Sequence, residues 1–219
     1  METHYDDKHG LAYELSYLAD GGVQLSAQSP ELEFRKTSYA DGHLDLRLVS
    51  HDDTVVFAVN ASGIQLTRGA RTVTLGAGAT ETDFDKARAL IAGSRAVKRY
   101  RQLGAALEAA NDDSATAHST LMGAAIVGLI DGDPGAPTRI AKRLGGKKTA
   151  GLRKAGMAVD CYASYENFTY NAWVDYESCM DLADWWNYSL VSHACTFRWV
   201  IRVEGYWFQY ISCSSFPLK

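Results

Sequence analysis

The placement of the four cysteines restricts the fold of this chain more than any other feature. All four lie in the last 60 of its 219 residues, and they form two pairs with equal spacing. Cys161 and Cys179 enclose 17 residues, and Cys195 and Cys213 also enclose 17 residues. Equal enclosures indicate two copies of one supersecondary unit, each closed by its own disulfide.

Residues that favour turns lie at the same place in both copies. Ten residues after the first cysteine of each pair stands Asn171 or Gly205, and these residue types best tolerate a left-handed backbone. At the third position of a three-residue hairpin loop, each would bring the cysteines of its pair opposite one another. The sequence therefore predicts two β-hairpins closed by the disulfides Cys161–Cys179 and Cys195–Cys213. Four cysteines allow three pairings, so the other two remain alternatives.

The first third of the chain alternates apolar and polar residues in short runs that are separated by turn residues. These runs predict about seven strands, within residues 11–17, 23–28, 32–34, 44–48, 55–59, 64–66 and 73–75. Strands at this spacing are typical of an antiparallel sheet with one face apolar and the other charged. We therefore expect an antiparallel β domain over residues 1–80.

The middle of the chain, residues 81–133, has a helical pattern. Thr82 resembles an N-cap before a first turn that contains acidic residues. The helix that follows extends to residue 110, with an interruption at Gly93 and a second cap at Ser94. A further helix over residues 115–130 is apolar on most sides, which favours a buried helix packed on the sheet; a short membrane-inserting hairpin is the alternative.

Residues 134–159 contain seven basic residues and no acidic ones. Between two acidic regions, this stretch is predicted to be a hinge or linker. Alternatives are attachment to phosphates or to an anionic membrane surface, and a processing site with cleavage between Gly146 and Lys147. The basic residues are Arg139, Lys142, Arg143, Lys147, Lys148, Arg153 and Lys154.

Residues 160–219 hold all five tryptophans and 16 of the 24 aromatic residues. These rings are interpreted either as the core of a small module or as an exposed surface for a sugar, a lipid headgroup or a protein. The candidate binding residues are Trp185, Trp186, Arg198, Trp199, Arg202 and Trp207.

Several classes of function are disfavoured by the sequence. A net charge of −4 gives no reason to expect nucleic-acid binding, and the sequence offers no metal-ligand spacing, cofactor motif or catalytic motif. Asp181, Asp184 and His193 form the only compact polar group near the unusual residues, so a hydrolase is the weakest alternative. The cysteines suggest an extracellular protein, but the N-terminus has no secretory signal pattern, so the compartment and the oligomeric state stay undetermined.

Together these features predict an α+β protein: an N-terminal antiparallel sheet, a helical middle and a C-terminal module of disulfide-stapled β-hairpins. The leading hypothesis is a non-enzymatic precursor. Its C-terminal segment would be a secreted antimicrobial or toxin-like effector that acts on anionic membranes or cell surfaces. The alternative is an intact protein that binds carbohydrate, such as a cell-surface glycan, or protein through the aromatic C-terminal module.

Overall fold

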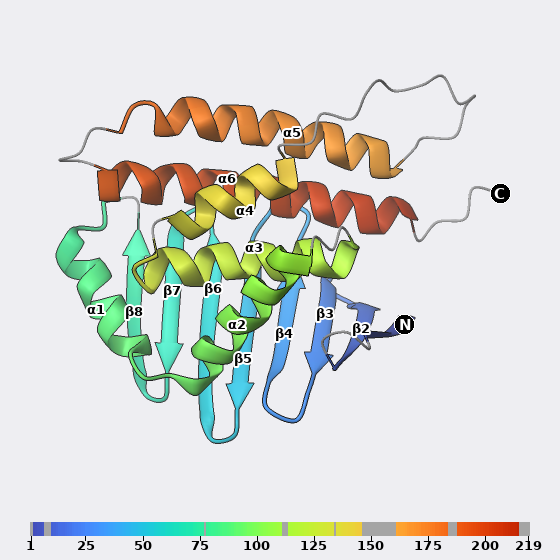
Figure 1. Cartoon of the computed structure of the whole chain (residues 1–219), viewed down its shortest axis with the longest axis horizontal. Coiled ribbons are helices and arrows are strands. Elements are labelled where there is room, and N and C mark those ends of the chain that lie inside the picture. Colours follow the sequence, from blue (N-terminus) through green and yellow to red (C-terminus); the bar gives the residue numbers. More distant parts are fainter. Residues whose placement is uncertain are drawn as a thin grey trace.

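One antiparallel sheet with helices on one face forms the framework of the protein (Figure 1). The structure is a computed structural model that describes residues 2–6, 10–76, 78–110, 114–133, 135–145, 161–183 and 188–214. Strands come first along the chain and helices follow. The predicted α+β class and the predicted N-terminal antiparallel sheet are thereby confirmed.

Within the described residues the sheet contains eight strands, and each pairs with its neighbour in the chain. Seven of them correspond to the predicted strands, and β1 is an additional one. Their bounds are β1 Glu2–Asp6, β2 Leu11–Tyr17, β3 Val23–Gln28, β4 Glu33–Ser38, β5 Leu44–Ser50, β6 Asp53–Asn60, β7 Gly63–Arg68 and β8 Arg71–Gly76. The short turns between consecutive strands, with glycines at positive φ such as Gly21 and Gly42, allow this simple up-and-down order.

The alternation of side chains places one apolar face of the sheet under the helices. A row of directly paired residues crosses the centre of this face from β3 to β7, and all five are fully buried: Leu25, Lys36, Leu46, Phe57 and Leu66. Four of the five are apolar, as the pattern predicts. The exception is Lys36 on β4, whose buried charge requires a partner from the helical layer.

Two helices predicted in the middle of the chain are separated by a break at the predicted position. Helix α1 covers Glu81–Ile91 and α2 covers Arg95–Ala110. Between them Gly93 has a φ of 71°, and the hydroxyl of Ser94 accepts the N–H of Val97 at 3.2 Å. The cap of α1 differs from the prediction: it is Thr80, whose backbone N–H and hydroxyl both donate to the carboxylate of Asp83, because the helix starts two residues earlier.

Helix α3, Ala115–Ile130, has the bounds that the sequence predicts and lies in the core. It packs against α1, α2, α6 and helix α4, Gly135–Gly145. Surrounding helices explain why its side chains are apolar almost all round. Among the described residues, no helix combines the length and the apolar character that crossing a membrane requires.

The predicted basic linker is helical in its first half. Within α4 the apolar side chains of Ala136, Ile140, Ala141 and Leu144 are buried at helical spacing. The basic side chains share the other side, where Arg139 pairs with Glu108 and Asp133 and Arg143 donates to the carbonyl of Glu108. Lys142 is exposed. Lys147, Lys148, Arg153, Lys154 and the predicted cleavage position after Gly146 lie outside the described residues.

The prediction of two C-terminal β-hairpins is wrong, because this region forms two long helices. Helix α5 covers Cys161–Met180 and α6 covers Tyr188–Ser214, and they pack side by side (Figure 1). The predicted pairing of the cysteines is also wrong. The disulfides are Cys161–Cys213 and Cys179–Cys195, so each joins α5 to α6, with Cα–Cα distances of 5.9 and 5.8 Å.

The equal cysteine spacing has a helical explanation. The two cysteines of each helix lie 18 residues apart, which is about five turns at 3.6 residues per turn, so both face the same side of their helix. The matching spacing on the antiparallel partner then brings the cysteines together at both ends, about 27 Å apart along the axis. The spacing therefore suits a stapled helix pair as well as it suits two hairpins.

Aromatic and β-branched residues favoured strands locally, but the burial pattern of α6 is helical. Thr196, Trp199, Val203 and Trp207 are buried at steps of three and four residues. Gly205 does not form a turn; it is a buried helical residue. A Cβ added to it would lie 3.5 Å from the carbonyl oxygen of Ala40 in the β4–β5 turn. Asn171 is an exposed residue of α5. Tertiary packing thus overrides the local strand preference.

Peptide mapping without reductant distinguishes the two arrangements of the disulfides. We expect one cross-linked peptide that contains Cys161 with Cys213 and another that contains Cys179 with Cys195, because antiparallel helices bring these residues together. A cross-linked peptide that joins Cys161 to Cys179 would contradict this pairing and support the hairpin arrangement. A digest of the reduced and alkylated protein is the control that identifies each peptide.

Candidate binding groove

A buried ion pair fixes helix α6 to the sheet. The ammonium Nζ of Lys36 on β4 lies 2.6 Å from the carboxylate Oε1 of Glu204 on α6, and both side chains are fully buried. The hydroxyl of Ser38 also donates to Glu204 Oε1. The ammonium donates further to the hydroxyl of Ser119 at 2.8 Å and to its backbone carbonyl at 3.1 Å. Three elements, β4, α3 and α6, therefore meet at one polar cluster.

The surroundings of this ion pair make it energetically costly to break. Burial lowers the pKa of Lys36, and the neighbouring carboxylate of Glu204 opposes this shift. The ring of Trp207 adds a cation–π contact at 5.1 Å from the ammonium. Glu204 Oε2 is buried without a hydrogen-bond partner among the described residues. Removing either charge would leave the other uncompensated in an apolar core.

Another side of α6 forms the wall of a groove of about 770 Å³. The helix contributes residues at a repeating spacing of three and four, so their side chains share one side of it. The rest of the lining comes from the β6–β7 turn, from β7 and β8, from the start of α1 and from α3. The lining on α6 consists of His193, Ala194, Phe197, Arg198, Ile201 and Arg202.

The floor of the groove is apolar and is built by residues that belong to the core. Ile64, Leu75, Phe84 and Leu129 line it and are each less than 5% exposed. They come from the consecutive elements β7, β8 and α1 and from α3, which lies further along the chain. On the α6 side, Phe197 packs against the same core. The groove therefore requires the sheet, the middle helices and α6 in their folded positions.

His193 is held in the groove as a neutral imidazole. Its ring stacks on Phe84 with 3.3 Å between the centroids and 9° between the planes. Burial is the main cause that lowers its pKa, to about 4. Its Nδ1 is buried and has no hydrogen-bond partner in the described part of the chain. Asp181 is exposed and does not line the groove, and Asp184 lies outside the described residues, so no acid–base group with His193 is assembled among the residues described.

The charged residues of the groove differ in how well they are paired. Glu81 forms an ion pair with Arg88 at 2.9 Å. Arg202 forms an ion pair with Asp175 and donates to the hydroxyl of Tyr206 at 3.5 Å. Arg198 is exposed and has no ion pair with any residue that the structure describes. The groove thus combines an apolar floor with one cation that the described chain leaves uncompensated.

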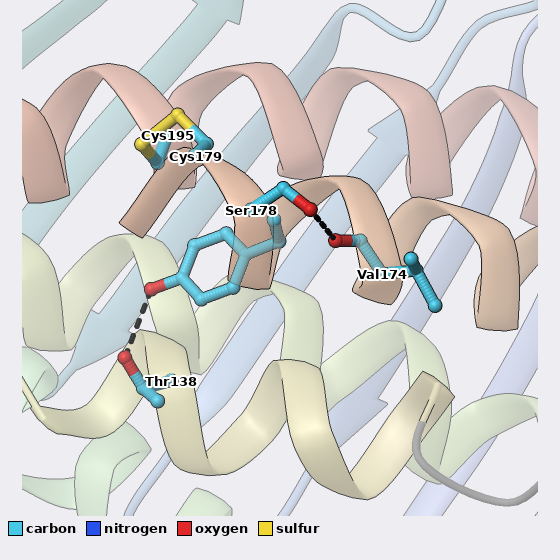
Figure 2. The surroundings of a disulfide bond; sticks show 6 residues. Thr138, Val174, Ser178, Cys179 and Cys195 are labelled. Atoms are coloured by element: carbon cyan, nitrogen blue, oxygen red, sulfur yellow. Dashed lines mark hydrogen bonds between the residues drawn. A yellow bond between two sulfur atoms is a disulfide. The ribbon is translucent and has the colours of Figure 1, made fainter. Parts of the chain in front are cut away.

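A smaller cavity of about 320 Å³ lies between α5 and α6 beside the Cys179–Cys195 disulfide. Arg198 and Arg202 line both this cavity and the groove. Figure 2 shows the disulfide joining the two helices. It also shows the hydroxyl of Ser178 donating a hydrogen bond to the backbone carbonyl of Val174 in α5. Thr138 of α4 is hydrogen-bonded to the hydroxyl of Tyr176 at 2.9 Å. The hydrogen bond of Thr138 with Tyr176 thus joins α5 to α4, and the disulfide joins α5 to α6.

The predicted binding residues separate into three groups. Arg198 and Arg202 lie at the groove. Trp199 and Trp207 are only 2% and 1% exposed and contribute to the core. Trp185 and Trp186 lie outside the described residues. Sequence reasoning missed Phe197 and Ile201, although their spacing from His193 at steps of four residues was a visible helical signal.

No family model, curated protein or solved structure shows significant similarity to this chain. Within the described ranges, no group of His, Cys, Asp and Glu side chains is arranged to hold a metal ion. The chemistry of the groove therefore follows from the residues that line it.

A double-mutant cycle measures how strongly the buried pair fixes α6. We expect Lys36→Met to lower the free energy of unfolding by about 3–5 kcal/mol, because Glu204 is left buried without its counter-charge. Adding Glu204→Gln should recover most of this loss, since an uncharged amide needs no counter-ion. Urea denaturation of both single variants and the double variant gives these values. Additive losses in the double variant would contradict the coupling.

Proposed function

We propose that the intact chain is a non-enzymatic binding protein that takes an apolar small molecule into the groove beside α6. The observation that carries this proposal is the groove itself: about 770 Å³, with core residues as its floor. This volume lies in the range typical of small-molecule sites, which are mostly apolar with a few polar groups. The proposal keeps the predicted class of an intact binding protein and moves its site from exposed aromatic rings to the groove.

The origin of the lining residues favours the intact chain. Ile64, Phe84 and Phe197 belong to β7, α1 and α6, so cutting away the C-terminal segment would remove one wall. The ion pair of Lys36 with Glu204 holds that wall in place. Because these supports are present in the folded chain, the site needs little rearrangement before a ligand enters.

Binding of 1-decanol, a neutral apolar probe, tests the proposal. We expect saturable binding by isothermal titration calorimetry, and we expect Ala194→Trp to weaken it at least about tenfold because the indole occupies the groove. Ala194 is exposed on the lining face of α6. Ala106→Trp, at an exposed position of α2 outside the lining, is the matched control. Unchanged binding in both Ala194→Trp and a second blocking variant, Ala61→Trp, would contradict the proposed site.

A precursor of a membrane-active or cell-surface effector is the second candidate function, and the position of the disulfides favours it. Both disulfides join α5 to α6, and neither links this pair to residues 1–145. A single cut after Gly146 would therefore leave a covalently closed pair of helices. The released pair would lose the contact of Trp207 with Lys36 of β4. This ring is buried in the uncut chain, and exposed tryptophan rings favour membrane interfaces.

The mass of the natural protein distinguishes the two candidates. An intact binding protein predicts one chain that contains residues from both sides of Gly146, and the sequence as given has a mass of 24.0 kDa. The precursor predicts separate fragments, with residues 147–219 found without the sheet. Mass spectrometry without reductant gives the answer, and a sample of the purified uncut chain taken through the same preparation controls for accidental proteolysis.

A further inference from the structure

We infer that the ligand of the groove is an amphipathic anion, an apolar chain that ends in a single carboxylate, with its charged group on Arg198. This inference rests on the proposed function and names its ligand class. It depends on how charge is distributed around the groove and on where Arg198 lies relative to the apolar floor.

Of the charged side chains that line the groove, Arg198 differs from the others in having no ion pair with a described residue. Glu81 is paired with Arg88, and Arg202 is paired with Asp175. His193 is neutral near pH 7, because its stacked and largely buried ring disfavours the charged form. The remaining charge is the guanidinium of Arg198, without an ion pair among the described residues. One uncompensated cation favours a ligand with one negative charge.

The position of Arg198 separates the two ends of such a ligand. It is exposed and lies on the lip shared by the groove and the smaller cavity between α5 and α6. Ile201 follows it on the same side of α6, and the buried Ile64 and Leu75 line the floor. A carboxylate at the lip would keep contact with water while the apolar chain enters the groove.

Arginine also fits the head group of this ligand. Its planar guanidinium binds a carboxylate through two parallel N–H donors, and such charge-assisted hydrogen bonds are about twice as strong as neutral ones. A neutral alcohol of the same chain length would make the apolar contacts but lack this interaction. The difference between the two ligands therefore reports on the contact with the carboxylate, and variants of Arg198 test whether this residue makes that contact.

The test compares decanoate with 1-decanol near pH 7, where the carboxylate is ionised. Calorimetric titrations use the unchanged full chain and the variants Arg198→Gln and Arg198→Lys. Arg47→Gln is the matched control, because it removes an exposed arginine from β5, on the outer face of the sheet. We expect decanoate to bind the unchanged chain about tenfold more tightly than decanol. This preference should disappear in Arg198→Gln, persist in part in Arg198→Lys and be unchanged in Arg47→Gln.

The outcomes separate this inference from the function on which it rests. Equal binding of the two probes by the unchanged chain would overturn the anionic ligand and leave an apolar site. A decanoate preference that survives in Arg198→Gln would overturn the assignment of the carboxylate to Arg198. Failure of both probes to bind would overturn the proposed function and the inference with it. Loss of the preference as salt is raised, with decanol binding unaffected, would further support a charge contact at the exposed lip.

Discussion

The ion pair between Lys36 and Glu204 is the interaction on which the arrangement of the C-terminal helices depends. It places a charge at the centre of the sheet's apolar face, and only a partner from the helical layer satisfies it. Such a pair adds little net stability compared with apolar residues of similar size, since desolvation offsets the attraction. Its effect is on position: a shifted α6 would leave two buried charges unpaired.

The disulfides also position the C-terminal helices, but through different contacts. They fix α5 and α6 to each other at both ends, whereas the ion pair fixes α6 to the sheet. The absence of a side chain at Gly42 lets α6 approach the β4–β5 turn closely, because a Cβ there would lie 2.0 Å from the backbone carbonyl oxygen of Ile201. With α6 held from both sides, its remaining side is free to line the groove.

The N-terminal and middle elements were predictable because their periods are regular and their breaks are local. Strand alternation, the break at Gly93 and the buried character of α3 all follow from neighbouring residues. The C-terminal region was not predictable in the same way. Its aromatic and β-branched residues favour strands locally, and the 18-residue spacing of Cys161 and Cys179 suits both a hairpin and five helical turns. Of the groove, the sequence singled out Arg198, Arg202 and His193 but not the apolar floor.

The sequence by itself determined the α+β class, most of the strands, three helices and the presence of disulfide-forming cysteines at one end of the chain. These features follow from patterns among residues that are close together in the sequence. Only the tertiary structure decided which cysteines pair, that Glu204 meets Lys36, and that Ile64, Phe84 and Phe197 line one groove. These contacts join residues from distant parts of the chain, and they form because buried charges and apolar surfaces must find partners in three dimensions.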